Sequence, residues 1–225
     1  MTFSITARCA RSGMFGIAVT SSSMAVAARC AHARAAVGAV ASQNITDPRL
    51  GPRGLDLMAA GESAAAALER MLAEHETRDF RQLALVDAAG GTAHHSGART
   101  LGRHAVAEGP GAVAAGNLLA DDAVPGAMLA AFADSAEEHL AERLVRALEA
   151  GVAAGGEEGP VRSAGVLVVD REAWPPVDLR VDWSDGDPIA DLRAVWESWR
   201  PQMDDYVTRA LDPASSPAYG VPGDP

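Results

Sequence analysis

The sequence predicts an α+β fold in which antiparallel β-sheets are covered by helices on their outer faces. Strand-like segments occur in groups, and pairs of helical segments separate these groups, whereas a parallel α/β fold would alternate them one by one. The chain has 225 residues, of which 48% are hydrophobic, so it can bury a substantial core. We expect a single domain over residues 1–211 and a tail over residues 212–225 that is rich in Pro, Ser and Gly.

The first two elements form a predicted hairpin. Residues 2–9 alternate between polar and apolar side chains, and residues 14–20 are a continuous apolar run typical of a central strand. If Cys9 pairs with Met14, Ser21 lies opposite the first residue of the first strand, Thr2. A one-residue bulge would place a neighbour of Ser21 there instead, such as Ser22.

The middle of the chain continues with a strand, two helices and two strands. Residues 35–42 are a third apolar strand, and the Gly-Pro-Arg-Gly segment 51–54 opens a helix that ends near residue 60. Ser63 begins a second helix, which carries one apolar stripe. Residues 81–87 and 92–96 read as strands around a Gly-Gly turn.

The second half repeats this order. A strand at residues 111–117 precedes two helices, at 124–132 and 138–150. The Val-rich run 163–170 is typical of a buried strand, and residues 177–183 alternate as in a strand with one solvated face.

A last helix begins at Asp187, which is placed as an N-cap before a proline at the first helical position, and Pro201 ends it. Its apolar stripe includes Trp196 and Trp199. We interpret the stripe as a packing surface, within the chain or against a second copy, and therefore expect a homodimer.

The composition excludes several classes of function. The formal net charge of −11 argues against a nucleic-acid or anionic-membrane partner. No apolar run approaches the length of a membrane span, so we expect a cytoplasmic protein. Every one of the 19 basic residues is Arg, so a base that works near neutral pH has to be a His, a carboxylate or an amino terminus. The two cysteines indicate neither a disulfide framework nor a thiolate metal site.

Thr2 is the most informative candidate for catalysis. A Thr in the second position is small enough for Met1 to be removed, which would leave Thr2 as the mature amino terminus. Such a residue carries a nucleophilic hydroxyl and its own base, because the α-amine accepts the proton. The amine has a pKa of about 7.7–8.0, so a useful fraction is neutral at physiological pH.

Polar residues at the ends of neighbouring predicted strands are candidates to support this nucleophile. Ser21 and Ser22 follow the second strand and would contact a substrate, with an ordinary loop as the alternative. Gln43 and Asn44 end the third strand, where their amides could bind an oxyanion or a substrate carbonyl, or else stabilise a loop. Asn117, which follows a glycine at a strand end, is our preferred oxyanion donor, with a left-handed turn residue as the alternative.

Charged residues supply further candidates. Arg53 lies between glycines at a helix start and suits a substrate carboxylate, although a structural salt bridge fits equally well. Asp47 could orient the amine or bind a cationic substrate group, or open a turn. His94 and His95 point to opposite faces of a strand and cannot readily share an ion. We therefore expect no metal and no other cofactor, and we retain His94 as a substrate contact.

Several segments, taken in order, resemble one known family. They are Thr2-Phe3-Ser4-Ile5, Gly16-Ile17-Ala18-Val19, Val37-Gly38-Ala39-Val40-Ala41-Ser42-Gln43, Gly51-Pro52-Arg53-Gly54-Leu55, Arg81-Gln82, Ser96-Gly97, Gly116-Asn117-Leu118-Leu119, Glu142-Arg143-Leu144, Ala154-Gly155-Gly156 and Ser163-Ala164. The chain is similar, to about residue 192, to domain of unknown function family 1028, which is assigned to the N-terminal nucleophile (Ntn) hydrolase superfamily.

The resemblance implies a four-layer αββα sandwich of two antiparallel sheets and a mature amino terminus at Thr2. It names no substrate. The chain departs from the family pattern at Ser42 and Ser96, where a Thr is common, and in the loop 157–160, where an Asp-Arg-Arg-Gly-like stretch is replaced.

These observations together predict an Ntn-type amidohydrolase. The Thr2 hydroxyl would attack the carbonyl of a small amide or amino-acid-like substrate, Asn117 with Asn44 or a backbone N–H would hold the oxyanion, and water would cleave the acyl-enzyme. One alternative is a catalytically silent protein of the same fold that binds a metabolite or a partner. Another is a metal-dependent hydrolase that uses His94 or His95.

Overall fold

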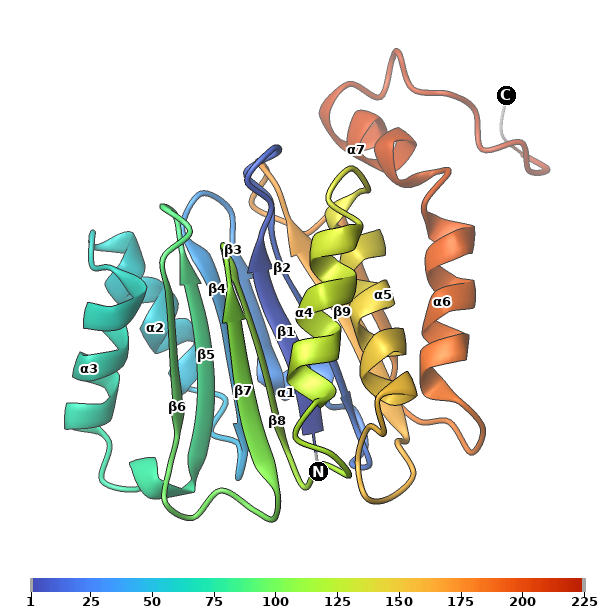
Figure 1. The fold of residues 1–225 in the computed structure, drawn as a ribbon. Helices are drawn as coiled ribbons and strands as arrows, with labels where there is room; N and C mark the ends of the chain where they lie inside the picture. Colours follow the sequence, from blue (N-terminus) through green and yellow to red (C-terminus); the bar gives the residue numbers. More distant parts are fainter. Residues whose placement is uncertain (1, 224–225) are drawn as a thin grey trace.

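The computed structural model describes residues 2–223, and two antiparallel sheets form its centre (Figure 1). The larger sheet has the strand order β10-β9-β2-β1-β8-β7 and the smaller sheet the order β3-β4-β5-β6. The strands of the larger sheet are β1 (Thr2–Arg8), β2 (Phe15–Ser21), β7 (His104–Gly109), β8 (Ala112–Asn117), β9 (Ser163–Val169) and β10 (Val177–Val181). Those of the smaller sheet are β3 (Ala31–Arg34), β4 (Gly38–Asn44), β5 (Arg81–Asp87) and β6 (Thr92–Ser96).

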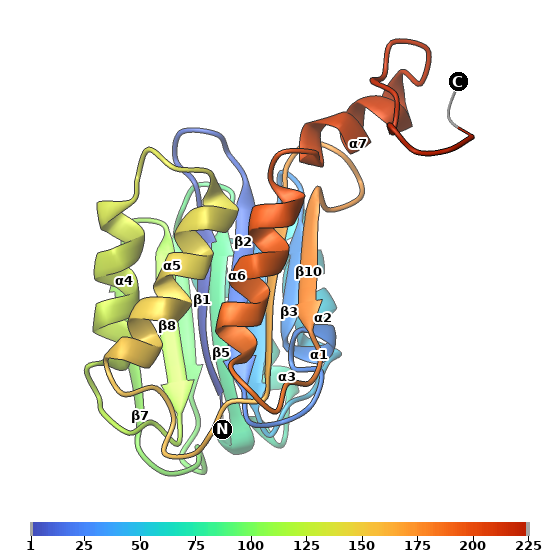
Figure 2. The ribbon, with the colours of Figure 1, turned by 90° about the vertical axis from the view of Figure 1, so that its right-hand side faces the viewer.

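Helices cover the outer face of each sheet. In the smaller sheet these are α2 (Leu50–Ala59) and α3 (Ala64–Glu74), and in the larger sheet α4 (Val124–Asp134), α5 (Leu140–Ala153) and α6 (Pro188–Trp199) (Figure 1). The short helix α1 (Ala27–Cys30) and a 3₁₀ turn (Arg78–Phe80) lie in connections. Helix α7 (Met203–Leu211) and the segment after it project away from the sheets (Figure 2). The predicted α+β class with antiparallel sheets is thus confirmed.

Alternation along β1 separates the two buried layers. Phe3 and Ile5 point toward the helices, where they pack with Leu144 and Trp196 in the largest apolar cluster. The opposite face of β1 points toward the smaller sheet and carries polar side chains near its amino end, including Ser4, which contacts β4. Between the sheets, alanines of β4 and β5 pack against larger apolar side chains of the other sheet, including Phe15 and Ile17.

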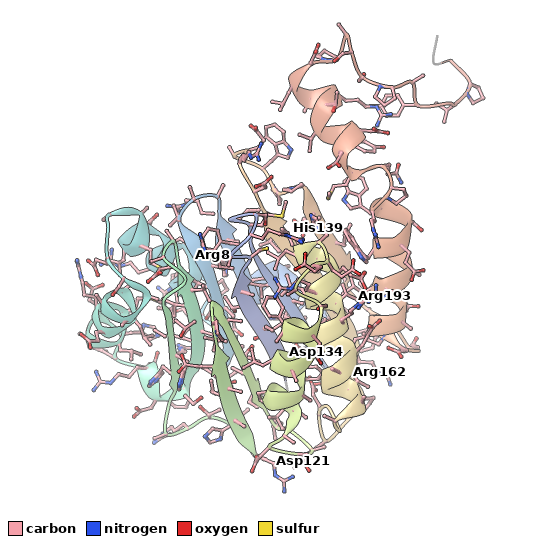
Figure 3. The ribbon with its side chains drawn as sticks, turned by 45° about the horizontal axis from the view of Figure 1, so that its top comes forward. Arg8, Asp121, Asp134, His139, Arg162 and Arg193 are labelled. Atoms are coloured by element: carbon pink, nitrogen blue, oxygen red, sulfur yellow. The ribbon has the colours of Figure 1, made fainter. Side chains whose placement is uncertain are left out.

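Helices α5 and α6 are joined by a partly buried charge cluster around Arg193, which Figure 3 labels. Arg193 of α6 contacts Glu142 at 2.6 Å and Glu149 at 2.8 Å, both on α5. Glu142 also accepts a hydrogen bond from the indole of Trp196, which is fully buried. The predicted apolar stripe of the last helix therefore packs within the chain at this position. The predicted N-cap is confirmed as well, because the Asp187 carboxylate accepts the N–H groups of residues 189 and 190.

The predicted register of the first hairpin is confirmed. The amide of Cys9 donates to the carbonyl of Met14 at 2.8 Å, and Phe3 pairs with Thr20 without a bulge. The next position along β1 is Thr2, and the register brings Ser21 opposite it.

Several elements differ from the sequence prediction. The expected third strand at 35–42 is β4, shifted to 38–44, and the four-residue strand β3 precedes it, too short to show a period. Strand β7 is half-exposed at the edge of its sheet and has no clean alternation, so its pattern resembles a loop. Helix α7 was not predicted: it follows Pro201, which was expected to end the last helix, and Met203 is its buried residue.

Candidate active site

Thr2 lies at the amino end of a central strand, between two strands that end or begin at the same level. It pairs with Asn117 of β8 on one side, and on the other its Oγ1 lies 3.2 Å from the Oγ of Ser21 of β2. The Ser21 hydroxyl is also 2.8 Å from that of Ser23. Thr2 is 5% exposed, and its side chain lies on the face of β1 that is turned toward the smaller sheet. The sheet thus places three hydroxyl groups and one amide within a small region.

A buried network of amide side chains lies directly behind Thr2 and connects the two sheets. Ser4 donates to the Oε1 of Gln43 at 2.7 Å, and the Nε2 of Gln43 donates to the Oε1 of Gln82 at 2.8 Å. The Nδ2 of Asn117 donates to the same Gln82 oxygen at 3.1 Å. All four side chains are 1% exposed or less. The network therefore fixes Asn117, the strand partner of Thr2, to the opposite sheet.

The hydrogen bonds of Gln82 determine which way the Asn117 amide points. The Nε2 of Gln82 donates to the carbonyl of Gly116 and to Ser96 Oγ, each at 3.0 Å. A carbonyl can only accept, so this nitrogen cannot be exchanged with Oε1, and Oε1 must face Asn117. Asn117 consequently turns its NH₂ toward Gln82. Its Oδ1 is buried and has no hydrogen-bond partner among residues 2–223.

Glu157 is a buried carboxylate at this same end of the larger sheet. Its backbone pairs with Leu119, just beyond β8, and its Oε2 accepts the N–H of Ser22, just beyond β2, at 3.3 Å. The residue is 7% exposed, and its Oε1 has no hydrogen-bond partner in the described part of the chain. Burial raises the pKa of this carboxyl to about 7.

Two residues beside the site have left-handed backbone conformations, which non-glycine residues seldom adopt. They are Asn44 at the end of β4, with φ of 71°, and Leu118 just after β8, with φ of 51°. Such conformations concentrate at functional positions, because the surrounding contacts have to enforce them.

Asn44 is not placed as the sequence prediction required. Its Nδ2 donates to the carbonyl of Phe80 at 2.6 Å, and its Oδ1 accepts the N–H of Leu101 at 3.2 Å. Both ends of this amide therefore hold loops, which was the alternative interpretation. Gln43, in contrast, points into the network behind Thr2, where it bonds to Ser4 and Gln82.

Arg53 and Asp47 lie on the helix-covered face of the smaller sheet, away from Thr2. Arg53 forms a two-pronged ion pair with Glu74, with nitrogen–oxygen distances of 2.8–3.2 Å. Asp47 is held by hydrogen bonds from Arg49, which lower the pKa of its carboxyl to about 2. Both predicted contacts line a separate surface cavity of about 280 Å³. Asp47 lies in the loop after β4 and Arg53 in α2, and the hydroxyl of the outward-facing Ser42 donates to the carbonyl of Asp47 at 3.1 Å.

His94 is also remote from Thr2. It lies on the edge strand β6, where its Nε2 is 3.7 Å from a carboxylate oxygen of Glu108 on β7. His95 contacts the carbonyl of Arg78 instead, at 3.0 Å. In residues 2–223 no group of three or more His, Cys, Asp or Glu side chains is arranged to hold a metal ion. Ser22 contributes to the site through its backbone N–H, which donates to Glu157 Oε2, and not through the predicted side-chain contact.

Two residues that shape the site, Gln82 and Glu157, were not among the predicted site residues. Gln82 was noted as part of a family-like segment, and its signal was a polar residue inside an otherwise apolar strand. Glu157 lies in a loop that was set aside because its sequence departs from the family pattern. Gln82 is the residue directly opposite Gln43 in the neighbouring strand, so cross-strand pairing of polar residues is the signal that indicates it.

These features define a class: an α+β protein of two facing antiparallel sheets with a polar site at the amino end of a central strand. The chain belongs to the family of unknown function DUF1028, whose model matches residues 2–192. It is also similar to the crystal structure of protein SPO2555 from Silicibacter pomeroyi, which is assigned to the same family, with 29% identity, a TM-score of 0.81 and coverage of 88% of each chain. No curated protein matches the chain. Within residues 2–223 no helix has the length and apolar character needed to cross a membrane.

Proposed function

We propose that this protein is an Ntn-type amidohydrolase, with a four-layer αββα sandwich and a mature amino terminus at Thr2. The observation that carries the proposal is the position of the Thr2 hydroxyl. It lies at the start of a central strand, 3.2 Å from the Ser21 hydroxyl and next to Asn117, with a hydrogen-bonded amide network behind it. A nucleophile needs such rigid support, because a small misplacement of the attacking atom costs a large part of the rate.

Removal of Met1 gives Thr2 a free α-amine, which acts as the base. The hydroxyl oxygen attacks the substrate carbonyl while the amine takes its proton, and a tetrahedral oxyanion forms. The amine then returns the proton to the leaving nitrogen, the C–N bond breaks, and an ester on Thr2 Oγ1 remains. Water, activated by the same amine, hydrolyses this ester and releases the acid. The reaction needs no cofactor.

Asn117 supplies the oxyanion donor in this proposal. Its Nδ2 carries two hydrogens, of which one is given to Gln82 and the second is available for the developing negative charge. Removal of one such donor typically slows hydrolysis by 10²–10³-fold. The small hydroxyl groups of Ser21 and Ser23 suit a small amide or amino-acid-like substrate better than a polypeptide.

An activity screen over small amides, ureides and N-acyl amino acids tests the proposal. On a substrate that is turned over, Thr2→Ala should lose activity by orders of magnitude, whereas Thr2→Ser should keep measurable turnover because it retains both reacting groups. Thr6→Ala is the matched control, since it removes the same hydroxyl from the same buried face of β1. Full activity in Thr2→Ala would move the chemistry elsewhere, and His94 would then be examined next.

A second candidate is a protein of the same fold that binds a metabolite or partner without catalysis. The low exposure of Thr2, 5%, is the observation that favours it, because a nucleophile must be reached by its substrate. The two candidates differ in one property that can be measured directly, namely whether Met1 is removed.

A further inference from the structure

Glu157 extends across the start of β1, because its two attachments lie on the two strands that flank it. The backbone of residues 156–158 pairs with residues 118–120, immediately after β8, with N–O distances of 3.0–3.1 Å. Its side chain reaches to the N–H of Ser22, immediately after β2. Because β8 and β2 are the neighbours of β1, the carboxylate lies at the level where the nitrogen of Thr2 begins the strand. The loop after α5 passes beside the amino terminus in both views (Figures 1 and 2).

Two glycines allow the loop to take this path. Gly155 and Gly156, which follow α5, have φ values of 120° and 62°, where a side chain would be strained. A Cβ on Gly156 would also lie 3.7 Å from the ring of Phe3, the residue next to Thr2. The loop is therefore packed directly on the first residues of β1.

Two acceptor oxygens at this place have no donor among the described residues. They are the Oε1 of Glu157 and the Oδ1 of Asn117, and both are buried. Buried acceptors in folded proteins are nearly always satisfied, so a pair of unsatisfied ones around a single residue points to a missing donor group. The nearby arginines do not supply it: Arg162 binds backbone carbonyls of residues 184 and 185, and Arg103 binds that of residue 120.

We propose that Glu157 holds the α-ammonium group of mature Thr2, with Asn117 Oδ1 as the second acceptor. This inference rests on the proposed function, since it concerns the chain that begins at Thr2. The nitrogen of Thr2 is an amide with one N–H while Met1 is attached, and an ammonium with three after its removal. The new N–H groups match the two unsatisfied oxygens, and the charge of the ammonium compensates that of a buried carboxylate.

Glu157 is accordingly a positioning residue that acts through the amine. A carboxylate beside the ammonium stabilises its charged form and keeps its nitrogen directed at the Thr2 hydroxyl. Burial of the Glu157 side chain, which raises the pKa of its carboxyl, also makes the pairing stronger because solvent does not screen it.

The test uses the absence of lysine. A chain released from an amino-terminal fusion so that it begins at Thr2 has one primary amine, its α-amine. The rate of its acylation by a small reagent, followed by intact mass against pH, gives the pKa of that amine. Glu157→Gln should lower this pKa by about one unit or more, a tenfold change in the acid constant. Glu158→Gln, an exposed neighbour in the same loop, should leave it unchanged.

A second measurement needs no variant. A crystal structure of the chain that begins at Thr2 should place a Glu157 carboxylate oxygen within about 3.2 Å of the Thr2 nitrogen.

The pH dependence of activity is a third measurement. In Glu157→Gln the low-pH limb of kcat/KM should move to lower pH, because the amine that acts as the base then loses its proton more easily. An unchanged amine pKa in Glu157→Gln, or a carboxylate turned away from the nitrogen, overturns the inference. Neither of these two results depends on turnover. The test of this inference is therefore independent of the Thr2→Ala experiment, which tests the proposed function.

Discussion

Gln82 is the residue on which the buried network depends, and Gln82→Leu tests its importance. The substitution keeps the approximate volume but removes the amide. Gln82 makes four side-chain hydrogen bonds, to Asn117, Gln43, Ser96 and the carbonyl of Gly116, and all four are lost. A hydrogen bond contributes about 0.5–1.5 kcal/mol net, so the loss of four destabilises the protein by roughly 2–6 kcal/mol. The added apolar contacts of Leu offset part of this, and we expect a net loss of about 3 kcal/mol.

Thermal and urea unfolding, followed by circular dichroism, measure this loss. For a domain of this size, about 3 kcal/mol corresponds to a fall in Tm of roughly 6–12 °C. Gln202→Leu is the matched control: it removes an amide that is exposed and bonded only to a backbone carbonyl within its own segment, and it should change stability by less than about 0.5 kcal/mol. A Gln82→Leu variant within about 1 kcal/mol of the original would refute the network as a support for Asn117.

The remaining predictions concern pH, the nucleophile and metals. Although burial raises it, hydrogen bonds from Arg193, Arg146 and Trp196 hold the pKa of Glu142 at about 2, below its usual 4.5. The stabilisation from this carboxylate is complete above pH 4.5 and is lost as the pH falls toward 2. Urea unfolding at pH 7 should therefore show Glu142→Gln to be less stable by about 2 kcal/mol, after allowance for solvent screening, with the difference shrinking toward pH 2. Activity should rise with pH through the pKa of the Thr2 amine, and loss of this limb in an active enzyme would argue for another base. EDTA should leave turnover unchanged, and chelator sensitivity would favour a metal-dependent hydrolase.

Local sequence patterns predicted the elements that bring the nucleophile into position. The alternation in residues 2–9 and the turn that follows were enough to place Ser21 beside Thr2, because a tight hairpin determines its own register. The N-caps at Ser63 and Asp187 could also be predicted from local sequence, since each depends on hydrogen bonds from the next few backbone amides to its side chain.

The rest of the site depends on contacts between distant segments. Gln82 meets Asn117 only because the two sheets face each other, and Glu157 meets Ser22 only because a loop crosses the end of β1. Neither contact leaves a periodic signal in the sequence. Asp47 and Arg53 were predicted as substrate contacts from local features, a turn and a helix start between glycines, and such features do not determine which face of the sheet the segment after β4 occupies.

The most direct test of the central claim, that Thr2 is the catalytic amino terminus, is the intact mass of the protein purified from its native host. The account predicts a mass lower by one methionine residue, with the chain beginning at Thr2. Quantitative retention of Met1 would contradict it, because Thr2 would then have no free amine to act as its base, and the non-catalytic candidate would take its place.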